Sequence, residues 1–179
     1  MNSRTSSSSR RKHELSRKIK IRRASTRDID ILIDQRRRMF EDLHHWSDSE
    51  HEIGDRTYRR WALDLMRRKL FAGFIAFLEG SPVAGGCVWL REIQPRPGLL
   101  VGRSPYLLSM YTKPEYRGLG LATRIVREAM KWSKSQGYGA MSLHASKLGR
   151  RVYKKIGWRR TWEMSVRLGG RPSPARRRR

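Results

Sequence analysis

The stretch that most restricts the fold of this chain lies between residues 106 and 137, where a strand pattern runs into two glycines and then into a helix pattern. YLLSMYT (106–112) is an apolar run typical of a strand, and LATRIVREAMKWSKSQG (121–137) repeats its apolar residues at helical spacing. Gly118 and Gly120 stand between them. A helix that starts directly after a strand and a glycine turn leaves its first N–H groups without partners, at the positive end of its dipole. Such a helix start can bind phosphate.

The residues of this turn are small enough for an anion to come close. Glycines lack Cβ atoms, Ala122 is also small, and Arg117 adds a positive charge at the rim. The spacing fits neither the G-x-x-x-x-G-K-[ST] loop nor the dinucleotide pattern G-x-G-x-x-G, because Thr123 stands where the last glycine of that pattern belongs. A tight turn without a ligand is the alternative interpretation.

The rest of the chain alternates strand and helix patterns. Before the glycine turn we expect an edge strand (19–25), a helix (26–46), an acidic loop (47–55), a second helix (56–70), a hairpin (71–80 and 83–93) and a Pro/Gly loop (94–105). After the helix at 121–137 we expect a strand (139–146), a short helix and turn (147–158) and a final strand (159–169). The order β-α-α-β-β-β-α-β-α-β predicts a mixed α+β domain.

Two motifs give the chain a specific resemblance. MYTKPEYRGLGLATRIV (110–126) resembles the acetyl-CoA-binding signature of the GNAT family of N-acetyltransferases, Q/R-x-x-G-x-G/A between the fourth strand and the third helix. LHASKLGRRVYKKIGW (143–158) resembles the family's other hallmark, a strand, a small residue or Asn, and a helix ending in L-Y-x-x-L-G-F. The resemblance covers residues 19–168 and implies the GNAT acyl-CoA N-acyltransferase fold, a central, mostly antiparallel twisted sheet flanked by helices.

The resemblance implies acetyl-CoA as the co-substrate and no metal. Backbone groups of the strand would bind the pantetheine arm, the turn and helix start would bind the pyrophosphate, and Ser146 stands where many members carry a cofactor-contacting Asn. The residues so implied are Met110, Tyr111, Thr112, Arg117, Gly118, Leu119, Gly120, Leu121, Ala122, Thr123 and Ser146.

The resemblance also implies direct attack of an amine on the thioester in a ternary complex, without a side-chain nucleophile. Tyr153 matches the family tyrosine proposed to protonate the leaving thiolate, and a core aromatic is the alternative interpretation. Where some members carry a glutamate base the chain has Met141, so the base stays open between Glu92, His144 and a water molecule. The acceptor, a protein N-terminus, a lysine or a small amine, is also open.

A group of acids falls where the first two helices of the family wall the acceptor cleft. The group could attract a cationic amine, form an exposed loop, or pair with the arginines at 36–38 and 59–60. Its members are Glu41, Asp42, Asp48, Glu50, Glu52 and Asp55.

The formal net charge of +25 is concentrated towards the ends of the chain. Residues 1–23 hold nine Lys/Arg and one Glu, which gives +8, and residues 167–179 hold six Arg and no acid, which gives +6. We expect disordered basic tails at 1–18 and 169–179 around one GNAT domain at 19–168. Such a charge attracts polyanions, so the tails either associate nonspecifically with nucleic acid or ribosomes or are solvated segments that only aid solubility. A catalytically weak GNAT-like module that binds nucleic acid is the alternative function.

The single cysteine, Cys87, excludes an internal disulfide and a cysteine-rich metal site. No apolar run approaches the roughly 18 residues that a membrane-spanning helix needs, and the first residues lack the hydrophobic stretch of a secretory signal. We therefore expect a cytoplasmic enzyme, either a monomer or a homodimer.

Overall fold

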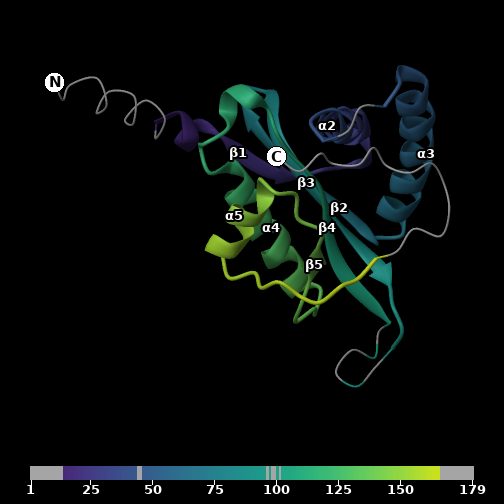
Figure 1. Cartoon of the computed structure of the whole chain (residues 1–179). Helices are drawn as coiled ribbons and strands as arrows, with labels where there is room; N and C mark the ends of the chain where they lie inside the picture. The colour runs from purple at the N-terminus through teal and green to yellow at the C-terminus, as the bar shows by residue number, and fades with distance from the viewer. Residues whose placement is uncertain (1–13, 44–45, 96, 98–99, 101, 166–179) are drawn as a thin grey trace, which may run out of the picture.

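The centre of the molecule is a five-stranded mixed sheet (Figure 1). The computed structural model describes residues 14–43, 46–95, 97, 100 and 102–165. The strands lie in sequence order: β1 (Lys20–Arg23), β2 (Phe71–Leu78), β3 (Ser81–Glu92), β4 (Arg103–Thr112) and β5 (Ser142–Leu143). The first four are antiparallel neighbours, and β5 is parallel to β4. The predicted α+β class is confirmed.

Helices cover both faces of this sheet (Figure 1). One face carries α2 (Ile29–Glu41), which follows the 3-10 helix η1 (Thr26–Asp28), and α3 (Asp48–Arg67); the other carries α4 (Leu121–Ser135) and α5 (Gly149–Lys155). Two successive glycines of β3 mark the two sides, because a Cβ on Gly85 would meet Gln35 of α2 and a Cβ on Gly86 would meet Ile125 of α4.

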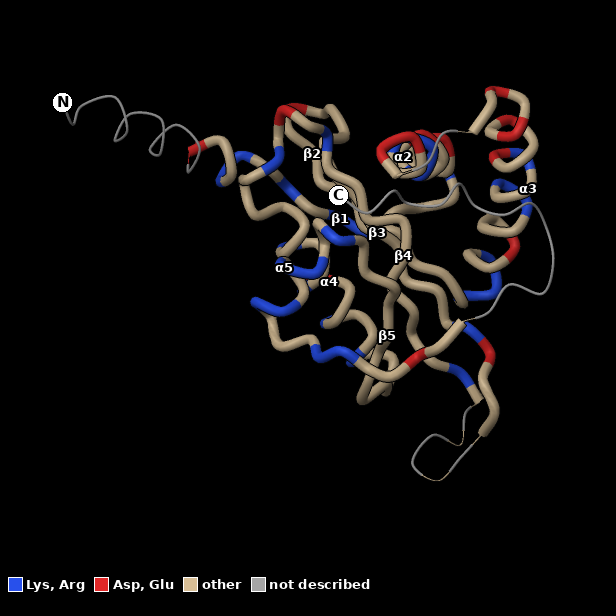
Figure 2. The backbone as a smooth tube through the Cα atoms, in the orientation of Figure 1, with Lys and Arg blue, Asp and Glu red and all other residues tan. Residues whose placement is uncertain are grey.

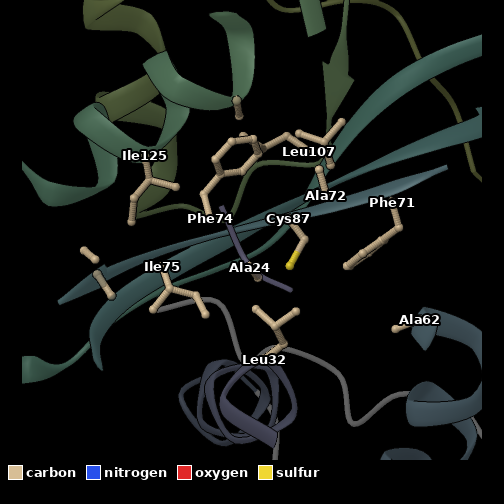
Figure 3. Packing of buried hydrophobic residues seen from close by; sticks show 14 of the residues in the cluster. Ala24, Leu32, Ala62, Phe71, Ala72, Phe74, Ile75, Cys87, Leu107 and Ile125 are labelled. Atoms are coloured by element: carbon tan, nitrogen blue, oxygen red, sulfur yellow. The ribbon is translucent and has the colours of Figure 1, made fainter. Parts of the chain in front are cut away.

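The core lies on both sides of β2. Consecutive residues of this strand point to opposite faces, Phe74 towards Ile125 of α4 and Ile75 towards Leu32 of α2 (Figure 3). Ile75 and Ile125 are fully buried and Leu32 nearly so. Full burial of one such side chain stabilises the fold by about 1.5–3 kcal/mol. This double burial explains why β2 reads as one continuous apolar run.

The connection between β2 and β3 is the predicted hairpin turn. Glu79 and Gly80 both have positive φ values, 48° and 81°. Two such residues in a row match the right-handed twist of an antiparallel pair, so a two-residue connection suffices.

The acidic stretch at 47–55, predicted as a loop, is helical, because α3 begins at Asp48 rather than at residue 56. Ser47 and Glu50 form a capping box: the Ser47 hydroxyl accepts the N–H of Glu50 at 3.3 Å, and the Glu50 carboxylate accepts the N–H of Ser47 at 2.9 Å. This pairing satisfies two donors that a helix start leaves free. The acids in the first turn also favour the positive end of the helix dipole.

The predicted final strand at 159–169 is wrong in the part that the structure describes, since residues 159–165 form no strand. Residues 166–169 lie outside the described part of the chain. β5 has only two residues, against the eight predicted at 139–146, and so it offers a further strand too short an edge to pair with. Trp162 and Met164 are accordingly 92% and 94% exposed.

Within the predicted basic tail at 1–18, residues 14–18 are helical. The guanidinium of Arg124, in the first turn of α4, donates to the carbonyls of Ser16 and Ile19, both at 2.7 Å. Residues 1–13 and 166–179, which contain the rest of the two predicted tails, lie outside the described residues.

Candidate functional site

The site begins at an irregularity in β4. Cys87 pairs with Leu108 and Gly85 with Tyr111, so Ser109 and Met110 together oppose the single residue Gly86. Ser109 has a φ of 52°, which places it in the left-handed region. A bulge of this kind interrupts the hydrogen bonds between two strands and frees backbone groups for other partners.

The bulge sends the side chains of the predicted pantetheine stretch to both sides of the sheet. The sulfur of Met110 lies against Gly86 on the α4 side. Tyr111 is 8% exposed, and burial raises the pKa of its hydroxyl, so it stays neutral. The carbonyl of Thr112 accepts a hydrogen bond from Nε of Arg117 at 3.0 Å.

Beyond β4 the chain makes the 3-10 helix η2 (Pro114–Tyr116) and the predicted glycine turn. Gly118 and Gly120 have φ values of 83° and 75°, and a Cβ on either would meet no atom within 4 Å. The space above the turn is therefore open. Positive φ at both positions explains why the sequence uses glycine there.

Helix α4 starts at Leu121 from Gly120 as its N-cap, with no side-chain hydrogen bond to its first amides. Leu121 is buried, whereas Ala122 and Thr123 are half-buried. The carbonyl of Leu119 accepts a hydrogen bond from the Ser16 hydroxyl at 3.4 Å, so the N-terminal segment contacts the turn. The uncapped amides and the dipole of α4 make this turn a site for a phosphate anion.

Arg117 is not a free charge at the rim. Its guanidinium pairs with Asp42 at 2.5 Å, just after the end of α2, and both side chains are about half exposed. Together with its bond to Thr112 this pair holds the turn against the opposite helix layer.

The second predicted cluster lies where α5 begins. The hydroxyl of Ser146 accepts the N–H of Gly149 at 3.1 Å, so Ser146 supports the start of α5. A Cβ on Gly149 would lie 3.0 Å from the ring of Tyr153 and 3.3 Å from the hydroxyl of Ser146, which brings these two predicted residues together. The Tyr153 ring also packs against Trp158, at 5.8 Å between centroids.

Tyr153 is half-buried, and burial raises the pKa of its hydroxyl to about 12. The hydroxyl has no hydrogen-bond partner among the described residues. At neutral pH this side chain is therefore a protonated donor that is free to serve a ligand.

His144 follows β5 at the point where β5 stops pairing with β4. Its Nδ1 hydrogen-bonds the hydroxyl of Tyr106, and its Nε2 lies 3.4 Å from the carboxylate of Glu163. The guanidinium of Arg91 stacks over the Tyr106 ring, 4.5 Å from its centroid. Tyr106, Arg91 and Glu163 could not be predicted from the sequence, since no local spacing links residues on β3, β4 and the segment after α5.

Glu92, the other predicted base, lies away from His144 and from the bulge of β4. It is exposed at the end of β3 and pairs with Arg103 at the start of β4. Ser109 is six residues further along β4, which is about 20 Å at the usual rise of a strand. The structure therefore brings Ser146 and Tyr153 together and sets His144 at the end of the parallel pair, but it leaves Glu92 at the far end of β4.

The acids of α2 and α3 are largely paired with arginines. Asp55 accepts from Nε of Arg37 at 2.7 Å and lies 3.7 Å from Arg36, and Glu50 bonds Ser47. Pairing with the arginines at 36–38, one of the alternatives left open by the sequence, therefore accounts for Asp55. Asp42 pairs with Arg117 instead.

The described residues contain no group of three or more His, Cys, Asp or Glu side chains placed to hold a metal ion. Cys87 is buried, and burial raises the pKa of its thiol to about 12, so it is not a ready nucleophile. Among the described helices, none has the length and apolar character to cross a membrane.

A bulged fourth strand, an open glycine turn and an uncapped helix define the class of acyl-CoA-dependent acyltransferases that the two motifs indicated. The chain belongs to the acetyltransferase (GNAT) family, whose model matches residues 36–158. Members of this family use acetyl-CoA as the co-substrate.

Solved structures have the same fold. A predicted acetyltransferase from Clostridium acetobutylicum, crystallised with acetyl-CoA, is 29% identical, with a TM-score of 0.75 over 84% of this chain and 96% of that one. A GCN5-related N-acetyltransferase from Ralstonia eutropha is 24% identical, with a TM-score of 0.75 over 85% and 99%. A ribosomal-protein-alanine N-acetyltransferase from Brucella melitensis is 18% identical, with a TM-score of 0.62 over 85% and 99%. No curated protein matches the chain.

Proposed function

We propose that this protein is an N-acetyltransferase that moves the acetyl group of acetyl-CoA to a primary amine by direct attack in a ternary complex. The observation that carries the proposal is the open space above Gly118 and Gly120 at the uncapped start of α4. Amides from the turn to Thr123 are the donors for the pyrophosphate. Acetyl-CoA supplies a thioester whose carbonyl carbon the amine attacks, and the C–S bond then breaks.

The bulge of β4 supports the binding of the pantetheine arm. Ser109 and Met110 have lost their regular pairing with β3, so this is the stretch of β4 with backbone groups free for a ligand. One N–H of the stretch is the donor that would polarise the thioester carbonyl. The pairing between β4 and β5 ends at Leu107 and Leu143, just before the bulge.

Tyr153 is the proposed acid. Its raised pKa keeps the proton on the phenol at neutral pH, and no described residue competes for it. The thiolate of coenzyme A leaves with a negative charge and takes this proton. Ser146, which lies beside Tyr153, fixes the start of the helix that carries it and retains a hydroxyl proton for a ligand.

His144 is the proposed base, in preference to Glu92. It stands where β4 and β5 part, whereas Glu92 lies about 20 Å along β4 from the bulge. The base must take a proton from the ammonium so that a neutral amine can attack. Nothing in the site favours the alternative of a module without catalysis.

Replacement of Gly120 by Glu tests the cofactor site. A carboxylate in the phosphate cradle should weaken coenzyme A binding more than about 100-fold, because like charges in contact cost several kcal/mol. Isothermal titration calorimetry with coenzyme A measures this without an acceptor.

Gly137 provides the matched control. It follows Gln136, the C-cap of α4, has a φ of 86°, and also has nothing within 4 Å of a built Cβ. Gly137→Glu therefore carries the same backbone strain of roughly 1–2 kcal/mol but leaves the cradle unchanged. Equal affinities for the two variants would refute the assigned site.

The acceptor is best found by incubating the protein with labelled acetyl-CoA and separate pools of peptides with free N-termini, lysine peptides, polyamines and aminoglycosides. Solved structures of this fold include enzymes for acceptors as different as a ribosomal-protein alanine and an aminoglycoside. These likenesses are under 25% identical and do not choose among the pools. A pool that becomes labelled only with active protein identifies the class.

A further inference from the structure

We propose that the side of the domain formed by β1, α4 and α5, here called the basic face, binds single-stranded nucleic acid. The proposal concerns exposed cations of the folded domain, not the tails and not the acetyl-transfer residues that α4 and α5 also carry. It rests on charge distribution, on the absence of internal ion pairs on α4 and α5, and on an aromatic hollow.

Charge is strongly segregated between the two sides of the sheet. Residues 121–160 contain eleven Lys/Arg and one acid, a net charge of +10, whereas residues 26–68 contain nine Arg and ten acids, a net charge of −1. Figure 2 shows acids and cations mixed on α2 and α3, whereas the colour on β1 and α5 is that of cations. A one-sided positive field is the expected footprint of a polyanion-binding surface.

The cations of α4 and α5 are not neutralised from within, whereas Arg22 of β1 pairs with Asp28 at 2.7 Å. In the described part of the chain no ion pair involves a Lys or Arg of α4 or α5, whereas the arginines of α2 and α3 are paired repeatedly. Arg127, Lys131 and Lys134 lie three and four residues apart and form one exposed stripe along α4. α5 presents two further exposed pairs, Arg150 with Arg151 and Lys154 with Lys155.

A hollow of about 240 Å³ lies on the same side, between β1 and the second half of α4. Half-buried Trp132 lines it beside the cations Arg22, Arg23 and Lys131 and the acid Glu128. The buried ring of Phe74 also lines it, 6.3 Å from the Trp132 ring between centroids. The volume is below the range of about 300–1,000 Å³ typical of whole small-molecule sites and suits a single planar ring. Aromatic rings beside cations are how proteins bind single strands, with a base on the ring and the backbone phosphate on the cation.

An anionic membrane fits the face less well. The apolar residues of α4, Ile125, Val126 and Ala129, are buried against the sheet, and the one exposed large hydrophobic side chain of this helix is Met130 at 38%. A membrane-surface helix needs an apolar side to insert into the lipid. Coenzyme A bound at the glycine turn does not account for the α4 stripe either, since the stripe starts at Arg127, beyond the turn and the first helical turn of α4.

The test compares two triple variants of the full chain. Each is titrated into a fluorescein-labelled oligouridylate of about 20 nucleotides, and binding is measured by fluorescence anisotropy at several salt concentrations. The face variant carries Arg127→Glu, Lys131→Glu and Lys134→Glu. Three lost phosphate contacts should reduce the salt slope by about 2 and the affinity about 100-fold at 0.1 M salt.

The control variant carries Arg56→Glu, Arg60→Glu and Arg67→Glu on α3, which changes the net charge equally at exposed positions on the other side. Its affinity should stay within about threefold of the unaltered chain, because charges further than the Debye length of about 10 Å are screened. Equal losses in both variants would mean that only net charge matters and would overturn the proposal.

Crosslinking locates the strand without any substitution. Ultraviolet irradiation of a 4-thiouridine-labelled oligomer should attach it to α4 peptides around Trp132. Attachment confined to residues 1–13 or 166–179, complete displacement of the oligomer by coenzyme A, or binding to phosphatidylglycerol vesicles but not to the oligomer would each overturn the proposal. The assays contain no acetyl-CoA or acceptor, so a failure of the proposed acetyl transfer leaves their outcome unaffected.

Discussion

Substitution of Arg124 by Met tests whether the N-terminal segment is part of the folded domain. The guanidinium donates to two backbone carbonyls, those of Ser16 and Ile19, at 2.7 Å each. Hydrogen bonds from a charged group contribute about 1.5–3 kcal/mol each. The contacts are only partly buried, so water replaces some of this. We therefore expect a loss of about 2–3 kcal/mol, while Met keeps the apolar part of the side chain packed.

Urea unfolding followed by tryptophan fluorescence measures this loss as a lower transition midpoint with an unchanged slope. For a chain of this size the same loss lowers Tm by about 4–12 °C. Arg127→Met is the matched control: Arg127 lies one turn further along α4, is exposed, and has no ion pair with any described residue. It should change stability by no more than about 0.5 kcal/mol. If the two variants unfold at the same urea concentration, Arg124 does not anchor residues 14–19 to the folded domain.

Two further predictions concern the chemistry. Tyr153→Phe should lower kcat about 100-fold or more, in line with the loss of a general acid, while coenzyme A affinity stays within about twofold in calorimetry; wild-type turnover with the acceptor found by labelling would remove Tyr153 from this role. Because burial raises the pKa of Tyr153 to about 12 from 10.0, the folded state holds this proton more tightly than the unfolded chain. Its contribution to stability is therefore complete below about pH 10 and is lost as the pH rises towards 12, a loss that the Phe variant lacks in alkaline unfolding curves. His144→Gln should lower kcat, whereas Glu92→Gln should leave it unchanged; the reverse result would exchange the two as base.

The parts of the molecule that the sequence predicted well are those set by neighbouring residues. The glycine turn depends on backbone conformation at Gly118 and Gly120, and the β2–β3 hairpin on two residues at its tip. In both cases a short segment contains the whole physical reason for its structure. The covered faces of β2 likewise appear as an uninterrupted apolar run.

The errors arose where a local pattern has two physical readings or where the partner is distant. An acidic cluster suggested a loop at 47–55, but Ser47 and Glu50 form a capping box that makes it a helix start. The alternating pattern at 159–169 suggested a strand, yet strand formation needs an edge to pair with, and β5 has two residues. The contacts of His144 join Tyr106, 38 residues earlier in the chain, to Glu163 on the segment after α5. No periodicity in the sequence reports such a pairing.

The unequal charge of the two helix layers makes the domain an electric dipole. Near any strongly negative body, such a molecule turns until α4 and α5 face that body and α2 and α3 point away from it. The electric field exerts a torque on the domain, so its orientation is set before the two surfaces touch. Helices α2 and α3, which carry most of the acids, then face the solution. A cationic amine can approach them there with no polyanion in between.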